Sequence, residues 1–90
     1  MWVLKLTTQF KKDLKRYKHR KRELEELRLI LAQLELSGSV SASYRPHKLS
    51  GKYADCMECH VMNDFLLIWI DTESSVITLV RLGTHSELFR

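Results

Sequence analysis

The feature that most constrains the fold is an apolar stripe at helical spacing that starts at Phe10 and ends at Leu34. Its members recur at intervals of three, four or seven residues: Phe10, Leu14, Tyr17, Leu24, Leu27, Leu31 and Leu34. A single helix over residues 8–36 would be about 43 Å long at 1.5 Å per residue. A compact chain of 90 residues has a radius of gyration of roughly 12 Å. The helix is therefore expected to break.

The break is expected at Lys18-His19-Arg20-Lys21-Arg22, because this stretch of the stripe has no apolar side chain. Breaking the helix there predicts an αα-hairpin with a strongly basic turn. Thr7 or Thr8 can cap the first helix by accepting a backbone N–H, and Gly38 suits the end of the second.

The remaining residues show the patterns of β-strands. Residues 2–6 are typical of a short strand, and residues 37–43 form a serine-rich surface loop. Residues 65–70 are apolar on both faces, as a central strand would be, and residues 76–82 form the last strand. Between these two we expect a five-residue hairpin loop at residues 71–75.

Side chains alternate from Tyr53 onwards, which predicts another strand with two different faces. Glu58 and His60 fall on one face, and the other face carries Tyr53, Met57, Cys59 and Val61. Together the elements predict a single α+β domain over residues 1–90: an N-terminal strand, the αα-hairpin and a mainly antiparallel meander. The helices should cover one face of the sheet and leave the other partly open.

Composition excludes several classes of protein. A hydrophobic content of 44% with 29% charged residues is that of an ordinary globular chain. The longest apolar run, residues 65–70, is too short to cross a bilayer. The N-terminus shows no basic leader followed by an apolar region and a cleavage site. We therefore expect a cytoplasmic protein, without a membrane partner, whose two cysteines stay reduced.

Positive charge is concentrated in one segment. Residues 11–22 hold eight Lys or Arg against Asp13 alone, whereas residues 23–90 hold six against ten Asp or Glu. Such a segment fits phosphate backbones or an acidic protein partner. A solvated helix face that contacts nothing is the alternative.

Cys56-Met57-Glu58-Cys59-His60 has the spacing of a c-type haem attachment site. In a strand, residues three apart point to opposite faces, so Cys56 and Cys59 could not reach the same porphyrin edge. The same geometry argues against a redox pair. A zinc site drawn from Cys59, His60, His47 or His85 stays open, although the spacings match no common closed site. We expect no bound metal and no cofactor.

Two or three histidines and one carboxylate should meet at one end of the sheet. His60 and Asp64 flank a turn between paired strands, and the strand that ends at Leu82 brings His85 toward the same end, with His47 in a preceding loop. Imidazoles beside a carboxylate and Arg81 suit acid–base chemistry at a phosphate, in which one group removes a 2′-hydroxyl proton and another protonates the leaving oxygen. Histidines scattered by chance are the alternative.

The span from Tyr44 to Phe89 resembles the bacterial YafQ-type toxins of the RelE superfamily. The resemblance rests on His47-Lys48-Leu49 followed by Gly51, on Glu58-Cys59-His60, on Asp64 followed by Leu66-Leu67-Ile68, and on Arg81-Leu82-Gly83-Thr84-His85-Ser86-Glu87-Leu88-Phe89. The last block is the most specific one. The helical half matches only in layout.

The resemblance implies a toxin of a type II toxin–antitoxin module: a ribosome-dependent mRNA endoribonuclease that a cognate antitoxin holds inactive. It implies His85 as the principal acid or base, with His47, His60 and Asp64 completing the catalytic site. Glu58 and Arg81 would tune or stabilise charge, and Phe89 would position a nucleotide. The basic turn would sit against ribosomal RNA through Lys18, Arg20, Lys21 and Arg22.

The chain departs from the family pattern at three positions. Met57 stands where an arginine is frequent, Asn63 where a proline is frequent, and Trp69 where a tyrosine is usual. The missing arginine bears on how the phosphate would be stabilised. Two hypotheses therefore remain: a ribonuclease toxin, and a module with a toxin-like fold that binds RNA or an antitoxin without cutting. They differ in whether His85 is needed for growth arrest.

Overall fold

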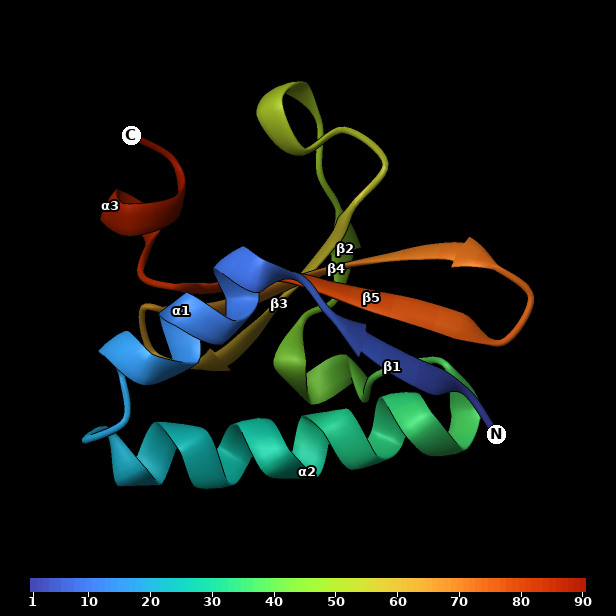
Figure 1. Cartoon of the computed structure of the whole chain (residues 1–90), viewed down its shortest axis with the longest axis horizontal. Helices are drawn as coiled ribbons and strands as arrows, with labels where there is room; N and C mark the ends of the chain where they lie inside the picture. Colours follow the sequence, from blue (N-terminus) through green and yellow to red (C-terminus); the bar gives the residue numbers. More distant parts are fainter.

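The computed structural model describes residues 1–71 and 74–90 with their side chains. In chain order the elements are β1 (Val3–Leu6), α1 (Thr8–Arg16), α2 (Lys21–Ser37), the short 3-10 helix η1 (Ala42–Tyr44), β2 (His47–Lys48), a second 3-10 helix η2 (Gly51–Tyr53), β3 (Met57–Met62), β4 (Phe65–Glu73), β5 (Val76–Gly83) and α3 (His85–Leu88) (Figure 1). The predicted strand, helix pair and meander are confirmed. The prediction that His47 lies in a loop is wrong, because His47 belongs to β2. The segment after β5 forms a short helix.

The strands form one five-stranded sheet with the order β1-β5-β4-β3-β2. β1 pairs in parallel with β5, while β2, β3, β4 and β5 pair antiparallel with their neighbours. The sheet is thus mainly antiparallel, as predicted. β4, the strand that is apolar on both faces, lies at the centre of the order.

The long helical pattern breaks as predicted, although slightly earlier than expected. α1 ends at Arg16 and α2 begins at Lys21, so Lys21 and Arg22 lie in the first turn of α2 instead of in the link. Buried Tyr17 ends α1, and its carbonyl accepts the N–H of Arg20 at 2.9 Å. With 17 residues, α2 is about 26 Å long at 1.5 Å per residue, which fits the longest dimension of the molecule, 32 Å.

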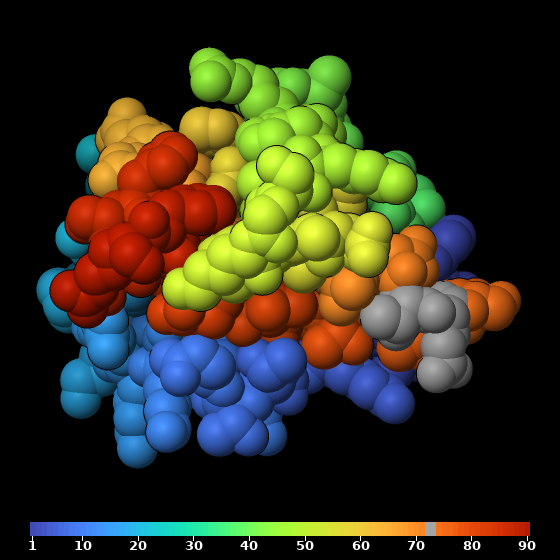
Figure 2. Space-filling model, turned by 90° about the horizontal axis from the view of Figure 1, so that it is seen from above, coloured from blue at the N-terminus to red at the C-terminus, as the bar shows by residue number. Residues whose placement is uncertain are grey.

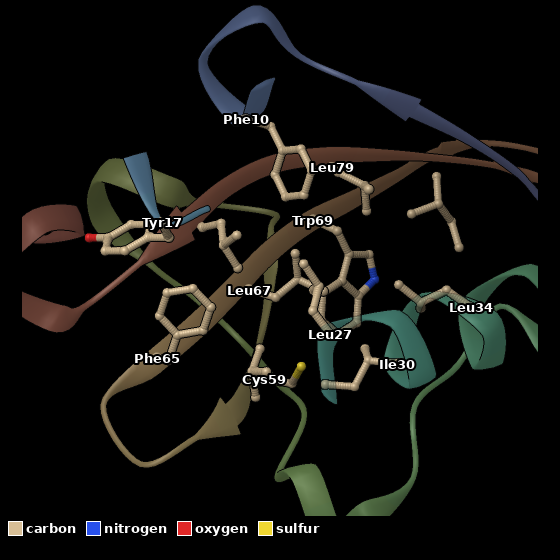
Figure 3. Packing of buried hydrophobic residues seen from close by; sticks show 13 residues of the cluster. Phe10, Tyr17, Leu27, Ile30, Leu34, Cys59, Phe65, Leu67, Trp69 and Leu79 are labelled. Carbon is tan, nitrogen blue, oxygen red and sulfur yellow. The ribbon is translucent and has the colours of Figure 1, made fainter. Parts of the chain in front are cut away.

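The main core lies between the helices and one face of the sheet. Leu27, Ile30 and Leu34 of α2 point toward Leu67 and Trp69 of β4 (Figure 3). Phe10 of α1, Tyr17, and residues of β3, β4 and β5 complete the cluster: Cys59, Val61, Phe65, Ile77, Leu79 and Leu82. Each fully buried side chain of this size contributes about 1.5–3 kcal/mol relative to exposure.

The opposite face of the sheet carries a second, smaller core and is otherwise only half-covered, in line with the expectation of a partly open face. Leu66 and Ile68 of β4 are fully buried there against Leu88 of α3 and against Tyr53 and Cys56. Figure 2 shows this face, with the red C-terminal segment beside the yellow-green segment around residues 50–55. Tyr53 therefore lies in η2 and packs on this face, instead of opening the strand with Met57 as expected.

α1 covers the edge of β5 where β1 stops at Leu6. The Thr7 hydroxyl accepts the N–H of Phe10 at 2.9 Å, which confirms it as the helix cap, and donates to the carbonyl of Val80 at 3.0 Å. Asp13 accepts the N–H of Leu82 at 2.9 Å. Side chains of α1 thus satisfy backbone groups that a bare edge strand would leave unpaired.

Gly38 ends α2 as predicted. Its φ of 74° lies in the left-handed region, and its N–H donates to the carbonyl of Leu34 at 2.9 Å. A side chain at this position would come within 2.5 Å of the Trp2 ring, so glycine also lets the end of α2 approach the N-terminus.

The β4–β5 hairpin differs from the expected loop at residues 71–75. Asp71 still pairs with Ile77, so it belongs to the strand. The part of the expected loop at residues 72 and 73 lies outside the residues described with their side chains. Among the described residues, no helix combines the length and the apolar composition needed to span a membrane.

Candidate active site

The sheet brings the predicted site residues to one end. His60 of β3 pairs with Leu66 of β4, and Leu66 pairs with Gly83, two residues before His85. Asp64 lies in the turn between β3 and β4, and His85 is the first residue of α3. The predicted meeting of His60, Asp64 and His85 is therefore confirmed by the strand register.

Asp64 holds His85 in one orientation. One carboxylate oxygen of Asp64 accepts the backbone N–H of His85 at 3.0 Å and lies 2.8 Å from its Nδ1. These hydrogen bonds, the backbone one foremost, lower the pKa of Asp64. An ionised carboxylate only accepts, so Nδ1 carries a proton and Nε2 is left for a substrate. The side chains of His85 and Asp64 are 57% and 59% exposed.

His47 and Glu58 form a second pair, across the β2–β3 ladder. His47 Nε2 lies 3.1 Å from Glu58 Oε1, and Nδ1 lies 2.9 Å from the carbonyl oxygen of Arg45. The carbonyl only accepts, so Nδ1 donates to it, while Nε2 faces the Glu58 carboxylate. His47 is 47% exposed but Glu58 only 4%. Both ring nitrogens of His47 are therefore occupied by the protein.

The loop that delivers His47 is anchored on α2. The Tyr44 hydroxyl donates a hydrogen bond to Glu26, which, together with burial, raises the pKa of Tyr44 to about 12. Arg45 follows with a φ of 54°, a left-handed conformation. This bend points the Arg45 carbonyl at the ring of His47.

The site rings form a row along the surface. The ring centres of His47 and His60 lie 6.2 Å apart, those of His60 and His85 lie 6.3 Å apart, and those of His85 and Phe89 lie 5.7 Å apart. Tyr53 continues the row, 5.4 Å from Phe89 in an edge-on arrangement. His60 is half-buried between His47 and His85, while Phe89 is exposed.

Arg81 meets this row at its Tyr53 end. Its guanidinium group bonds to the buried carboxylate of Asp13 at 2.9 Å and to the Tyr53 hydroxyl at 3.3 Å. The charge-stabilising role expected for Arg81 stays a prediction, and its guanidinium is already engaged by Asp13. Asp13 and Tyr53 are the residues near the site that we did not expect. The isolated acid within the basic segment was the one sequence signal for Asp13.

The basic turn, which contains Lys18, Arg20, Lys21 and Arg22, reaches the histidine site through Arg20. The Arg20 guanidinium lies over the rings of Tyr17 and Phe65, 5.2 and 5.8 Å from their centres, and Phe65 directly follows Asp64. After the hydrogen bonds from His85, the charge of Arg20 is a further cause of the lowered pKa of Asp64. Lys18, Lys21 and Arg22 are exposed.

The cysteines belong to separate cores. Cys59 packs in the main core and Cys56 in the second one, which confirms that they face opposite sides of the sheet. Both are free thiols, and burial raises the pKa of Cys59 to about 12. Within the described part of the chain, no group of three or more His, Cys, Asp or Glu residues could hold a metal ion.

Several solved structures with the same architecture are those of toxins. A structure of a metal-bound toxin from Helicobacter pylori is 33% identical, with a TM-score of 0.85, and the match covers 99% of this chain and 100% of that one. The toxin in the Escherichia coli DinJ–YafQ toxin–antitoxin complex is 27% identical, with a TM-score of 0.81, and the match covers 99% of this chain and 98% of that one.

Sequence comparison gives the same answer. The mRNA interferase toxin YafQ of Escherichia coli strain K12 is 29% identical over 82 residues, which is 90% of this chain and 88% of that protein. The model of the family described as "Bacterial toxin of type II toxin-antitoxin system, YafQ" matches residues 3–90. The chain therefore belongs to the YafQ family of bacterial type II toxins.

Proposed function

We propose that this chain is an endoribonuclease that cleaves mRNA by acid–base chemistry without a metal. The observation that carries the proposal is the His85 ring, which Asp64 holds at Nδ1 so that Nε2 faces outward for a substrate. The name of the Escherichia coli relative, an mRNA interferase toxin, supports the substrate class.

The proposed reaction uses the 2′-hydroxyl of the RNA as the nucleophile. One imidazole removes the hydroxyl proton, the 2′-oxygen attacks the adjacent phosphorus, and the bond to the 5′-oxygen breaks. A second imidazole then gives a proton to the departing 5′-oxygen. The products are a 2′,3′-cyclic phosphate and a 5′-hydroxyl. Positioned acids and bases each contribute typically about 10²–10⁴-fold to such a rate.

We assign the two proton transfers to His85 and His60. Their rings are neighbours, and among the described contacts the His60 ring makes no hydrogen bond to the protein. His47 is less suited to the transfers because its nitrogens already contact Arg45 and Glu58. In this proposal the His47–Glu58 pair tunes the charge beside His60.

Substrate positioning falls to the exposed ring of Phe89 and to the basic turn. Phe89 lies beside His85, where a nucleotide base can stack on it, and such stacking is worth about 1–3 kcal/mol per base. Arg20 borders Asp64, and exposed Lys18, Lys21 and Arg22 extend the positive charge away from the site. We propose that this charge docks on ribosomal RNA, so that cutting requires a translating ribosome in the cytoplasm.

A cognate antitoxin is the proposed protein partner. The Escherichia coli relative was crystallised as the DinJ–YafQ toxin–antitoxin complex, and the structural match to this chain covers 98% of that toxin. We propose that an antitoxin binds this chain likewise and holds it inactive.

A non-catalytic binding module is the second candidate. Met57 replaces an arginine that is frequent in the family, and Arg81 is bound to Asp13, so neither position offers a free guanidinium to a phosphate. If the charge of the transition state is left unstabilised, the protein would bind RNA or an antitoxin without cutting.

Induced expression in bacteria separates the two candidates. We expect growth to stop, mRNA to shorten, and the new 3′ ends to carry 2′,3′-cyclic phosphates, as read by end-specific sequencing. For the control, purified protein is added to a cell-free translation reaction with and without an inhibitor of translation initiation, and the inhibitor should protect the transcripts. Soluble protein with continued growth and intact transcripts would exclude the ribonuclease and favour the binding module.

A further inference from the structure

The guanidinium group of Arg81 uses all three of its nitrogens inside the protein. Nε donates to Asp13 Oδ2 at 2.9 Å, Nη2 donates to Asp13 Oδ1 at 3.3 Å, and Nη1 donates to the Tyr53 hydroxyl at 3.3 Å. Arg81 is 18% exposed and Asp13 only 1%. A phosphate that captured this guanidinium would leave the buried Asp13 carboxylate without its cation, an unfavourable exchange.

Tyr53 extends this network to the C-terminal helix. Its hydroxyl accepts from Arg81 and donates to the backbone carbonyl of Leu88 at 3.0 Å. Its ring packs edge-on against Phe89. One chain of hydrogen bonds therefore runs from Asp13 in α1 through β5 and η2 to the last residue of α3.

The position of α3 depends on contacts of this kind. The helix has four residues, and a helix so short has no stability of its own in water. It begins with His85 and is followed by Phe89, and the two rings lie 5.7 Å apart. Any shift of the Leu88 carbonyl would move both rings together.

We propose that Asp13, Arg81 and Tyr53 are positioning residues, which fix α3 so that His85 and Phe89 meet the substrate in one geometry. Arg81 then serves the reaction without touching the phosphate, in contrast to the role that the family resemblance implies. The kinetic consequence rests on the proposed ribonuclease function. The structural consequence, a fixed α3, does not depend on it.

Tyr53→Phe is the least disruptive test, because it removes the hydroxyl and keeps the ring against Phe89. We expect single-turnover cleavage of mRNA on ribosomes at saturating protein to slow by about tenfold, since small misplacements of reacting groups carry large rate penalties. The protein concentration that gives half the maximal rate should stay unchanged. Ile30→Val removes one buried methylene from α2 and is the control for lost stability. This variant should cleave at the wild-type rate.

Asp13→Asn separates positioning from phosphate binding. If Arg81 bound the phosphate, removing the competing carboxylate would leave cleavage unchanged or make it faster. If Arg81 acts by positioning, Asp13→Asn should slow cleavage about as much as Tyr53→Phe. The double variant should then be no slower than the slower single variant, because both substitutions cut the same network. Cleavage by Asp13→Asn at or above the wild-type rate would overturn the inference.

Amide hydrogen exchange, measured by NMR, tests the network without any cleavage. The N–H groups of Leu88 and Phe89 are hydrogen-bonded inside α3. Their exchange should be about tenfold faster in Tyr53→Phe and Asp13→Asn, and unchanged in Ile30→Val, because only the first two release α3 locally. If wild-type protein cuts no RNA but exchange responds in this way, the proposed function fails and the network stands. Unchanged exchange in both network variants would overturn the network even if the wild type cuts RNA.

Discussion

The site contains two histidine–carboxylate pairs that share their chemistry and differ in their surroundings. In the His85–Asp64 pair both side chains are more than half exposed, and one carboxylate oxygen accepts from both the backbone and the ring of the histidine. In the His47–Glu58 pair the carboxylate is buried, with Oε2 left without a hydrogen-bond partner among the described residues.

The different surroundings of the two pairs indicate which histidine can exchange protons with a substrate. Asp64 occupies one nitrogen of His85 and leaves the other open to solvent. Glu58 and the Arg45 carbonyl occupy both nitrogens of His47. The His85–Asp64 pair therefore suits proton transfer, whereas the His47–Glu58 pair, with its buried carboxylate, suits holding a loop in place.

Removal of His85 should have the largest effect. We expect His85→Ala to lower single-turnover cleavage on ribosomes by about 10²–10⁴-fold, because a positioned acid or base is lost. The free energy of unfolding, measured in urea, should change by less than about 0.5 kcal/mol, since the side chain is exposed. A folded His85→Ala variant that still arrests growth would remove this residue from the mechanism.

The second largest effect is expected for Asp64→Asn. The rate of single-turnover cleavage should fall by about 10–100-fold, because the His85 ring keeps a hydrogen-bond partner but loses the charge that orients it. The pKa of Asp64 is lowered in the folded protein. The pair therefore stabilises the fold above the ordinary Asp pKa of about 3.9, and this contribution is lost as the pH falls through the lowered folded value.

Urea unfolding of wild type and Asp64→Asn over a range of pH tests this sign. The difference in unfolding free energy should be present at pH 6 and should shrink as the pH falls from the ordinary Asp pKa of about 3.9 through the lowered folded value. A difference that grows on acidification would contradict the assignment of Asp64 as the charged partner of His85.

Loss of the His47–Glu58 pair should affect the stability of the protein more than the rate of cleavage. We expect His47→Ala to destabilise the protein by about 1–3 kcal/mol in urea unfolding, because Glu58 then has no partner for either oxygen. The matched variant His85→Ala should cost less. Adding Glu58→Leu to His47→Ala should recover part of the loss, since both polar partners are then gone. Equal losses for the two histidines would mean that burial of Glu58 does not distinguish the pairs.

The basic turn should have a smaller effect, confined to binding. We expect a triple variant to bind ribosomes more weakly; it carries Lys18→Gln, Lys21→Gln and Arg22→Gln. The slope of log affinity against log salt concentration should become shallower by about one unit for each phosphate that is no longer neutralised. Folding should be almost unchanged, because exposed charges add little stability. Arg20 is left in place because it covers Tyr17 and Phe65 beside the His85–Asp64 pair.

Lys5→Gln removes an exposed cation from β1 and is the control for this experiment. Unaltered affinity and salt slope in the triple variant would mean that the turn is a solvated face or an antitoxin contact instead of the ribosome-docking surface.

Chelation should have the smallest effect of all. Neither pair requires a metal in the proposed reaction. The toxin is first treated with EDTA, and magnesium is then added in excess so that the ribosomes of the assay stay intact. We expect the treated toxin to cleave at the same rate as untreated toxin. Zinc bound at about one per chain and released together with activity would instead point to a metal site around Cys59 and His60.

The sequence by itself determined the elements and the end of the sheet at which the site forms. The apolar stripe from Phe10 to Leu34 would need a single helix longer than a compact chain of this size can hold. The break therefore followed from the length of the stripe alone. Residues on either side of a tight turn are neighbours in any antiparallel pair, which is why the sequence alone could place His60, Asp64 and His85 together.

The tertiary structure alone decided the partners of the buried polar groups. Asp13 and Arg81 are 68 residues apart, and no local pattern links them. The burial of Glu58 beside His47 depends on β2, a strand of two residues too short to leave a periodic signal. Spacing along the chain reports which face a residue takes, whereas the partner across a packed interface is set by where separate elements dock. For this reason the imidazoles could be predicted from sequence, and the engagement of Arg81 by Asp13 and Tyr53 could not.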